Sequence, residues 1–203
     1  KFDSAYKHAV YDGKIELDTF HLGEMLGTED LGKVTLTATL EGEGLTLDSL
    51  HTTIDAVIKE VEAMKYTYHD IVIGGKMDKK QFNGSIHIDD PNLKFDFKGL
   101  VNLDSTNANF SFTAKLDTIN LHKLNLASTP MGISLNLDVD LQGLSSRDID
   151  GIAAITDIKI NDSLVAYTMD SLVIEAFDSD TGKTIEIRSP ILNGYIAGKY
   201  NLE

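Results

Sequence analysis

The stretch from Ile133 to Leu141 reads ISLNLDVDL, an unbroken alternation of aliphatic residues with serine, asparagine and aspartate. Successive side chains of a β-strand point to opposite faces of a sheet, so this stretch predicts a strand with one apolar and one polar face. Runs of the same kind occur at residues 33–40, 93–98 and 109–116. None of these runs has the 3.6-residue period of an amphipathic helix.

The alternation continues, with more irregularity, through most of the remaining chain. It covers residues 14–20, 50–62, 65–75, 82–89, 151–160, 164–176, 183–188 and 191–202. We therefore expect an antiparallel sheet of many strands with one face in water. Helical patterns are confined to Leu22–Leu26 and Leu121–Leu126, each a single turn at most. Residues 50–63 also fit a helical face, but their many β-branched residues favour a strand.

Composition limits the classes of function. The 203 residues have a formal net charge of −14 and contain no cysteine. Such an acidic chain lacks the basic footprint that nucleic acids require, so we expect no nucleic-acid partner. No run approaches the roughly 18 apolar residues of a membrane-spanning helix. Because the chain begins at Lys1 and ends within an alternating pattern, we expect it to be a segment of a longer polypeptide.

The sequence also repeats itself at a spacing of about 100 residues. Residues 17–22 return at 116–121, residues 66–73 return at 167–174, and residues 86–103 return at 185–202. The three matches occur in the same order, which is typical of arrays whose units bury apolar surface against their neighbours. We therefore divide the chain into two β-repeat units, residues 1–103 and 104–203, within one continuous sheet.

No motif indicates an enzyme, a metal site or a cofactor. The six histidines occur singly, without the spacing of a zinc site. Gly74-Gly75-Lys76 lacks the spacing and the following helix of a phosphate-binding loop, and we interpret it as a turn. Residues 178–182 and 89–92 are interpreted as hairpin turns. We therefore expect no catalytic residues, no metal and no cofactor.

A family resemblance rests on residues 82–103, which read FNGSIHIDDPNLKFDFKGLVNL, and on the phrases at 110–112 and 121–126. These resemble stretches of the TamB-type envelope proteins of the Bacteroidota. Leu141-Gln142-Gly143 and Ile149-Asp150-Gly151 are similar to a strand-entry phrase of the broader AsmA-like group. The resemblance implies a long curled antiparallel sheet, called a β-taco or repeating β-groove, with an apolar concave face and very little helix.

The same resemblance implies a periplasmic protein whose parent chain is anchored in the inner membrane. The family is associated with phospholipid transport between the inner and outer membranes, and with outer-membrane protein assembly and secretion. The implied partners are phospholipid acyl chains and an outer-membrane barrel assembly partner, the latter contacted through other parts of the parent chain.

The alternation supplies a physical argument for an apolar groove. A continuous apolar face needs a cover, because large exposed apolar patches are rare. The candidate groove residues are Val34, Leu36, Ala38, Leu40, Leu93, Phe95, Phe97, Phe110, Phe112, Leu135, Leu137, Val139 and Leu141.

Three alternatives to a lipid groove are open from the sequence. The chain could be an ordinary β-sandwich whose two halves cover each other without a ligand. It could be a scaffold that binds outer-membrane protein substrates by adding a partner strand to a sheet edge. The third alternative, an adhesin-like sandwich, is disfavoured by the absence of tryptophan and the scattered tyrosines.

Overall fold

The computed structural model of the protein describes residues 9–145, 148–162, 165–180 and 182–198. These residues form one antiparallel sheet of twelve strands that is not closed, with one five-residue helix. The strands are β1 Val10–His21, β2 Leu31–Glu43, β3 His51–Ala63, β4 Tyr66–Asp78, β5 Gln81–Asp90, β6 Leu93–Asn102, β7 Asn109–Asn120, β8 Met131–Gln142, β9 Asp150–Asp162, β10 Ala166–Ser179, β11 Gly182–Arg188 and β12 Asn193–Gly198. The all-β prediction is confirmed.

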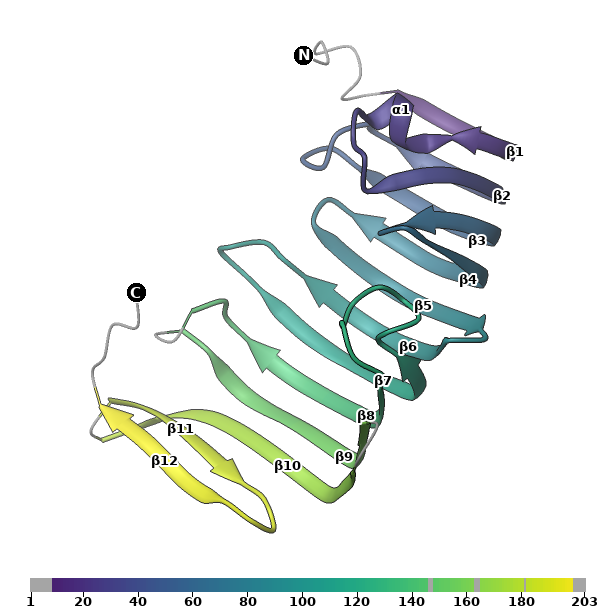
Figure 1. Ribbon diagram of the computed structural model, residues 1–203. Helices are drawn as coiled ribbons and strands as arrows, with labels where there is room; N and C mark the ends of the chain where they lie inside the picture. Colours follow the sequence, from purple (N-terminus) through teal and green to yellow (C-terminus); the bar gives the residue numbers. More distant parts are fainter. Residues whose placement is uncertain (1–8, 146–147, 163–164, 181, 199–203) are drawn as a thin grey trace.

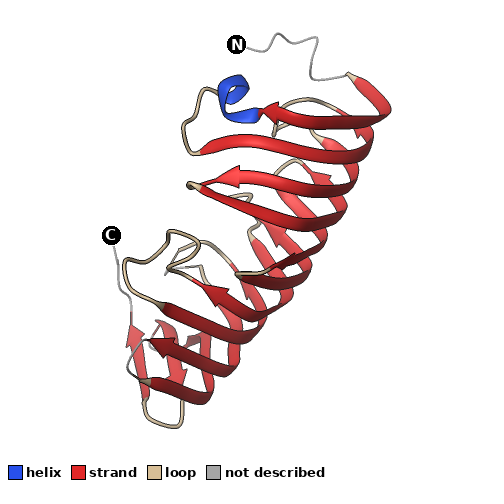
Figure 2. Cartoon of the chain, turned by 45° about the vertical axis from the view of Figure 1, so that its right-hand side comes forward, coloured by secondary structure: helices blue, strands red, loops and turns tan. Residues whose placement is uncertain are grey.

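The strands follow one another through the sheet in chain order, so every connection is a hairpin. Figure 1 shows them stacked like rungs from β1 at one end of the molecule to β12 at the other. Figure 2 shows that the strands curve along their length, which bends the sheet. Within the described residues, extensive contacts join only neighbouring strands, apart from the contact of helix α1 (Leu22–Leu26) with β2.

Three segments that the sequence left uncertain are now defined. Residues 51–63 form strand β3 and are not helical, as their β-branched residues predicted. Helix α1 forms where a single turn was expected and ends at Gly27, whose φ of 68° is the left-handed conformation that commonly ends helices. Residues 121–126 form hydrogen-bonded turns, with the Leu126 amide donating to the Leu121 carbonyl at 2.8 Å.

The interpretation of Gly74-Gly75-Lys76 as a turn is wrong, because these residues lie inside β4. Gly75 lies opposite Gly84 on β5, and their backbones approach so closely that a Cβ on Gly75 would lie 2.6 Å from the Gly84 Cα. Glycine is needed here for close strand approach rather than for chain reversal.

The sequence repeat corresponds to a displacement of six strands. Ile15 on β1 pairs with Ala38 on β2, and the residues 99 positions later, Ala114 and Leu137, pair in the same way on β7 and β8. The β2–β3, β3–β4 and β5–β6 pairs have counterparts at the same displacement. The β10–β11 pair is the exception, because its register differs from that of β4–β5. The sheet is continuous across residue 104, since β6 pairs with β7.

Candidate functional site

One face of the sheet, here called the apolar face, is defined by the strand register. Residues directly opposite each other in an antiparallel pair project from the same face. Starting at Phe97 on β6 and following the register in both directions gives one residue on each strand from β1 to β10. This central row is Ile15, Ala38, Ala56, Ile73, Ile86, Phe97, Ala114, Leu137, Ile155 and Leu172. No polar side chain interrupts it.

Further rows on either side of the central row are also almost wholly apolar. One consists of Leu17, Leu36, Ile58, Ile71, Ile88, Phe95, Leu116 and Leu135. The register places all thirteen candidate groove residues on this face. The candidate list leaves out the members on β1, β3, β4, β5, β9 and β10, and on all of these strands except β5 a bulge makes the alternation irregular.

Bulges cause that irregularity. On six strands, neighbouring members of the apolar face are three residues apart in the chain instead of two. These steps are Leu17 to Phe20, Ile58 to Val61, Tyr68 to Ile71, Leu116 to Ile119, Ile155 to Ile158 and Met169 to Leu172. With strict alternation, residues three positions apart would point to opposite faces. The extra residue in each bulge keeps both side chains on the same face. The bulged strands β1, β3 and β4 correspond to β7, β9 and β10 in the repeat.

Three of the bulges contain a residue with positive φ: Thr19 at 53°, Asp70 at 49° and Asp157 at 52°. Two of these residues form hydrogen bonds with side chains of the neighbouring strand. The amide of Thr19 donates to the Thr35 hydroxyl at 3.1 Å, and the Asn136 side-chain amide donates to Asp157 at 2.7 Å. The bulges at Thr19 and Asp157 are therefore tied to the neighbouring strands β2 and β8.

A string of phenylalanines crosses the middle of the apolar face. The ring centroids of Phe82 and Phe97 are 6.1 Å apart, and those of Phe97 and Phe112 are 5.2 Å apart. These separations are within the range of favourable aromatic pairs. The rings come from β5, β6 and β7, so they connect the two repeat units.

The apolar face is only partly covered. Among the described residues, five of the buried hydrophobic residues are alanines. Only one large hydrophobic side chain there, that of Leu124, is less than 2% exposed. The large side chains of the central row, such as Phe97 and Leu137, are half-buried, and Ile15 is 42% exposed. The sheet therefore leaves part of its apolar surface accessible.

One hollow on the apolar face lies at its β1 end and has a volume of about 550 Å³. Its lining includes Tyr11, Ile15, Leu40 and Ile54 from β1 to β3. Leu50, from the loop between β2 and β3, also lines it. Aliphatic and aromatic side chains dominate this lining, which fits an apolar ligand better than a polar one.

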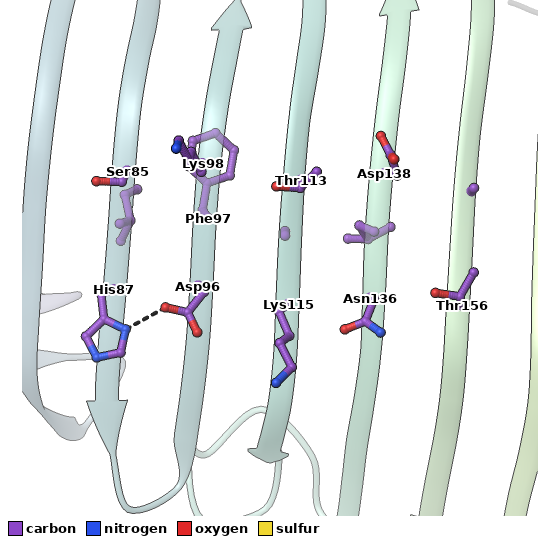
Figure 3. A pocket seen from close by; sticks show the side chains of 14 residues that line it. Ser85, His87, Asp96, Phe97, Lys98, Thr113, Lys115, Asn136, Asp138 and Thr156 are labelled. Atoms are coloured by element: carbon purple, nitrogen blue, oxygen red, sulfur yellow. Dashed lines mark hydrogen bonds and ion pairs between the residues drawn. The ribbon is translucent and has the colours of Figure 1, made fainter.

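A second, larger hollow of about 750 Å³ lies over β5 to β9, and most of its side chains come from the opposite, polar face. Figure 3 shows His87, Asp96, Lys115 and Asn136 side by side on consecutive strands. His87 Nδ1 lies 2.6 Å from an oxygen of Asp96. Sequence reasoning missed this hollow because it treated the polar positions only as a wetted surface.

The end of the apolar face near the β5–β6 turn contains a fully buried carboxylate, Asp90. It accepts hydrogen bonds from the Tyr66 hydroxyl at 2.7 Å, the His69 amide at 3.0 Å and the Asn92 amide at 2.7 Å. Burial raises the pKa of Tyr66 and of Tyr68, and the Asp90 charge raises both further. This network ties the β5–β6 turn to β4.

The loop between β7 and β8 reaches across the same end of the sheet. The side-chain amide of Asn125 donates to the Lys65 carbonyl at 3.0 Å, in the turn between β3 and β4. Leu124 beside it is fully buried. This hydrogen bond passes over the ends of β5 and β6. It links the two repeat units in addition to the backbone hydrogen bonds between strands.

The described residues contain no group of three or more metal-ligating side chains, and none of their helices is long and apolar enough to cross a membrane. No protein-family model, curated protein sequence or solved structure matches the chain.

Proposed function

We propose that the chain binds phospholipid acyl chains along its apolar face and serves as a non-catalytic segment of a periplasmic lipid conduit of the TamB type. The observation that carries this proposal is the central row, which runs over ten strands without a polar residue. The apolar face would be the inner, concave surface of the bent sheet. The resemblance to TamB-type proteins adds a role in outer-membrane protein assembly, performed with partners of the parent chain.

The chemistry of the face suits acyl chains. Burying each methylene contributes about 0.8 kcal/mol and needs no directional partner. Neighbouring strands lie about 4.8 Å apart, so a row of ten strands offers about 40 Å of apolar contact. An acyl chain therefore finds equivalent contacts at each strand, and the headgroup stays in water at the rim.

The large apolar side chains are half-buried, which favours an open apolar face over a closed sandwich. A sandwich that covers its own apolar face buries its large side chains, as protein interiors do. Here Phe97, Phe112 and Leu137 remain partly exposed. An acyl chain would remove this surface from water.

Two neighbouring positions on β7 test the proposal. Phe112 lies on the apolar face and Thr113 on the polar face. Phe112→Glu introduces a charge into the groove and is expected to lower the affinity for a fluorescent phosphatidylethanolamine at least about tenfold. Thr113→Glu, with the same added charge, is expected to leave binding unchanged. Circular dichroism of both variants controls for folding.

Native mass spectrometry of protein extracted from membranes without detergent supplies a second readout. Bound phospholipid in the native protein and in Thr113→Glu, and its loss from Phe112→Glu, is the expected result. Protein that carries no phospholipid and does not bind the fluorescent lipid would reject the proposal.

A further inference from the structure

The loop between β7 and β8, residues 121–130, is held together mainly by its own hydrogen bonds. The amides of Leu126 and Ala127 both donate to the Leu121 carbonyl, at 2.8 and 3.1 Å. The two ends of the loop meet where the Leu121 amide donates to the Met131 carbonyl at 2.9 Å. A compact loop with adjacent ends, like an Ω-loop, can move as one body about its stem.

One side chain connects this loop to a distant part of the sheet. The side-chain amide of Asn125 donates to the Lys65 carbonyl at 3.0 Å and to the Met64 carbonyl at 3.5 Å, in the turn between β3 and β4. Among the described residues, these are the only hydrogen bonds that join residues 121–130 to a part of the chain outside the β7–β8 hairpin. Both are exposed to water, so breaking them costs little. We call Asn125 the latch.

The loop between β1 and β2 has the same form without a latch. The Thr28 amide donates to the Gly23 carbonyl at 3.0 Å, which is the closing bond of the β7–β8 loop 98 positions earlier in the chain. Gly27 has a φ of 68° and corresponds to Asn125, whose φ is 61°. Glycine has no side chain that could bond to another strand. The form of the loop therefore does not depend on the latch.

Leu124 packs the β7–β8 loop onto the apolar face. Leu124 is fully buried, while the polar face at this end of the sheet stays open. There, Asp89 and Lys94 lie opposite each other on β5 and β6, and their side chains are more than half exposed. Asp90, next to Asp89 but on the apolar side, is fully buried. The loop therefore covers the apolar face at the ends of β5 and β6.

We propose that residues 121–130 form a hinged lid over this end of the apolar face, kept shut by the Asn125 latch and by burial of Leu124. Opening breaks two exposed hydrogen bonds and exposes one leucine, and it keeps the hydrogen bonds inside the loop. The exposed leucine makes the open state a minor population. The role of the lid rests on the proposed function: an acyl chain enters or leaves the apolar face beneath it.

Thiol reactivity tests the lid motion without any lipid, because the chain contains no native cysteine. The thiol of Leu124→Cys is buried under the shut lid and reacts with DTNB only when the lid opens. Ala176→Cys is the control, because position 176 lies inside β10, is 2% exposed and is reached only when the sheet itself opens. With each rate divided by that of the same variant in urea, Leu124→Cys is expected to react at least about a hundredfold faster than Ala176→Cys.

Removing the latch supplies the second measurement. Asn125→Ala, combined with Leu124→Cys, is expected to raise the DTNB rate about fivefold. Asn83→Ala in the same background, at an exposed position of β5, is the matched control and is expected to leave the rate unchanged. Urea unfolding of each variant separates lid opening from a loss of global stability. Equal normalised rates for Leu124→Cys and Ala176→Cys, or no response to Asn125→Ala, would overturn the lid.

A cross-link across the latch tests what the lid does. Lys65→Cys/Asn125→Cys places two exposed thiols on the turn and on the loop, and a short bismaleimide bridges them. The bridged protein is expected to exchange fluorescent phosphatidylethanolamine at least about tenfold more slowly than the same variant without the bridge. Unchanged exchange of bound lipid would reject the lid as the passage for acyl chains. A protein that binds no lipid would reject the proposed function, and the thiol rates would still decide whether the lid moves.

Discussion

Phe97 and Ala114 lie directly opposite each other on β6 and β7, at the junction of the two sequence repeats. The small side chain of Ala114, which is 6% exposed, leaves room for the Phe97 ring to contact that of Phe112 at 5.2 Å. The junction is therefore packed like the rest of the apolar face, and the two repeats form one surface.

The phenylalanine string is expected to stabilise this junction. Phe97→Ala removes a half-buried ring and its contacts with Phe82 and Phe112, and should lower the free energy of unfolding by about 2 kcal/mol. Lys98→Ala, next to it on the polar face, should have little effect. Urea denaturation of both variants measures the difference, and equal losses would show that the string does not stabilise the fold.

Asp90 and Asp89 are neighbours with opposite surroundings. Asp90→Ala leaves three half-buried donors without their acceptor and should destabilise the protein by about 3 kcal/mol. Asp89 forms an exposed ion pair with Lys94 at 2.6 Å, so Asp89→Ala should leave stability within experimental error. Thermal and urea unfolding check both. A mild effect of Asp90→Ala would mean that the network around Tyr66 is not cooperative.

Alkaline pH should weaken the same network. The pKa of Tyr66 is raised in the folded state, mainly by burial, with the hydrogen bond to Asp90 and the Asp90 charge acting in the same direction and the Asn92 hydrogen bond opposing them. A raised pKa means that the neutral phenol is favoured in the folded protein. Its stabilising contribution is complete below the unfolded-state pKa of about 10 and is lost as the pH rises through the folded-state pKa.

Tyr66→Phe removes this titration, so the free energy of unfolding should fall less steeply above pH 10 in the variant. Tyr195→Phe, at an exposed position of β12, removes a phenol that has no part in this network and is the control variant. Urea unfolding from pH 8 to 11 provides the comparison. Parallel curves for wild type and Tyr66→Phe would show that the phenol does not contribute.

The bulge in β4 predicts an unusual preference at Asp70, whose φ is 49°. A β-branched residue tolerates this conformation poorly, so Asp70→Val should destabilise the sheet by about 1–2 kcal/mol, although valine normally favours strands. Asp70→Gly should be neutral or stabilising. Asp55→Val on β3, at an exposed position outside the positive-φ residues, is the matched control. Equal effects at positions 55 and 70 would argue against the bulge.

The sequence predicts the fold class and much of the apolar face because strict alternation, as at residues 133–141, fits a β-strand and does not fit a helix. It fails where a bulge inserts a residue. The step from Leu17 to Phe20 looks like a break in the pattern, yet both side chains lie on one face. The same step recurs at Leu116 and Ile119 in the sequence repeat. Only the strand register shows that it marks a bulge in both copies.

Other features have no sequence signal at all. Asp89 and Asp90 are chemically identical, and only the position of Asp90 on the apolar side of β5, beside Tyr66, makes it a buried acceptor. The hollow over His87 and Asp96 depends on the register that places these residues opposite each other, which alternation does not encode. Gly75 similarly resembles a turn residue until the register places it opposite Gly84.

Photo-cross-linking at two adjacent positions on β6 tests the central claim most directly. A photoreactive amino acid at Phe97 faces the apolar row, and one at Lys98 faces the polar side, with the same backbone environment. In cells labelled with radioactive phosphate, position 97 is expected to give a lipid adduct and position 98 none. Equal labelling at both positions, or no lipid adduct at position 97, would contradict a lipid-binding apolar face.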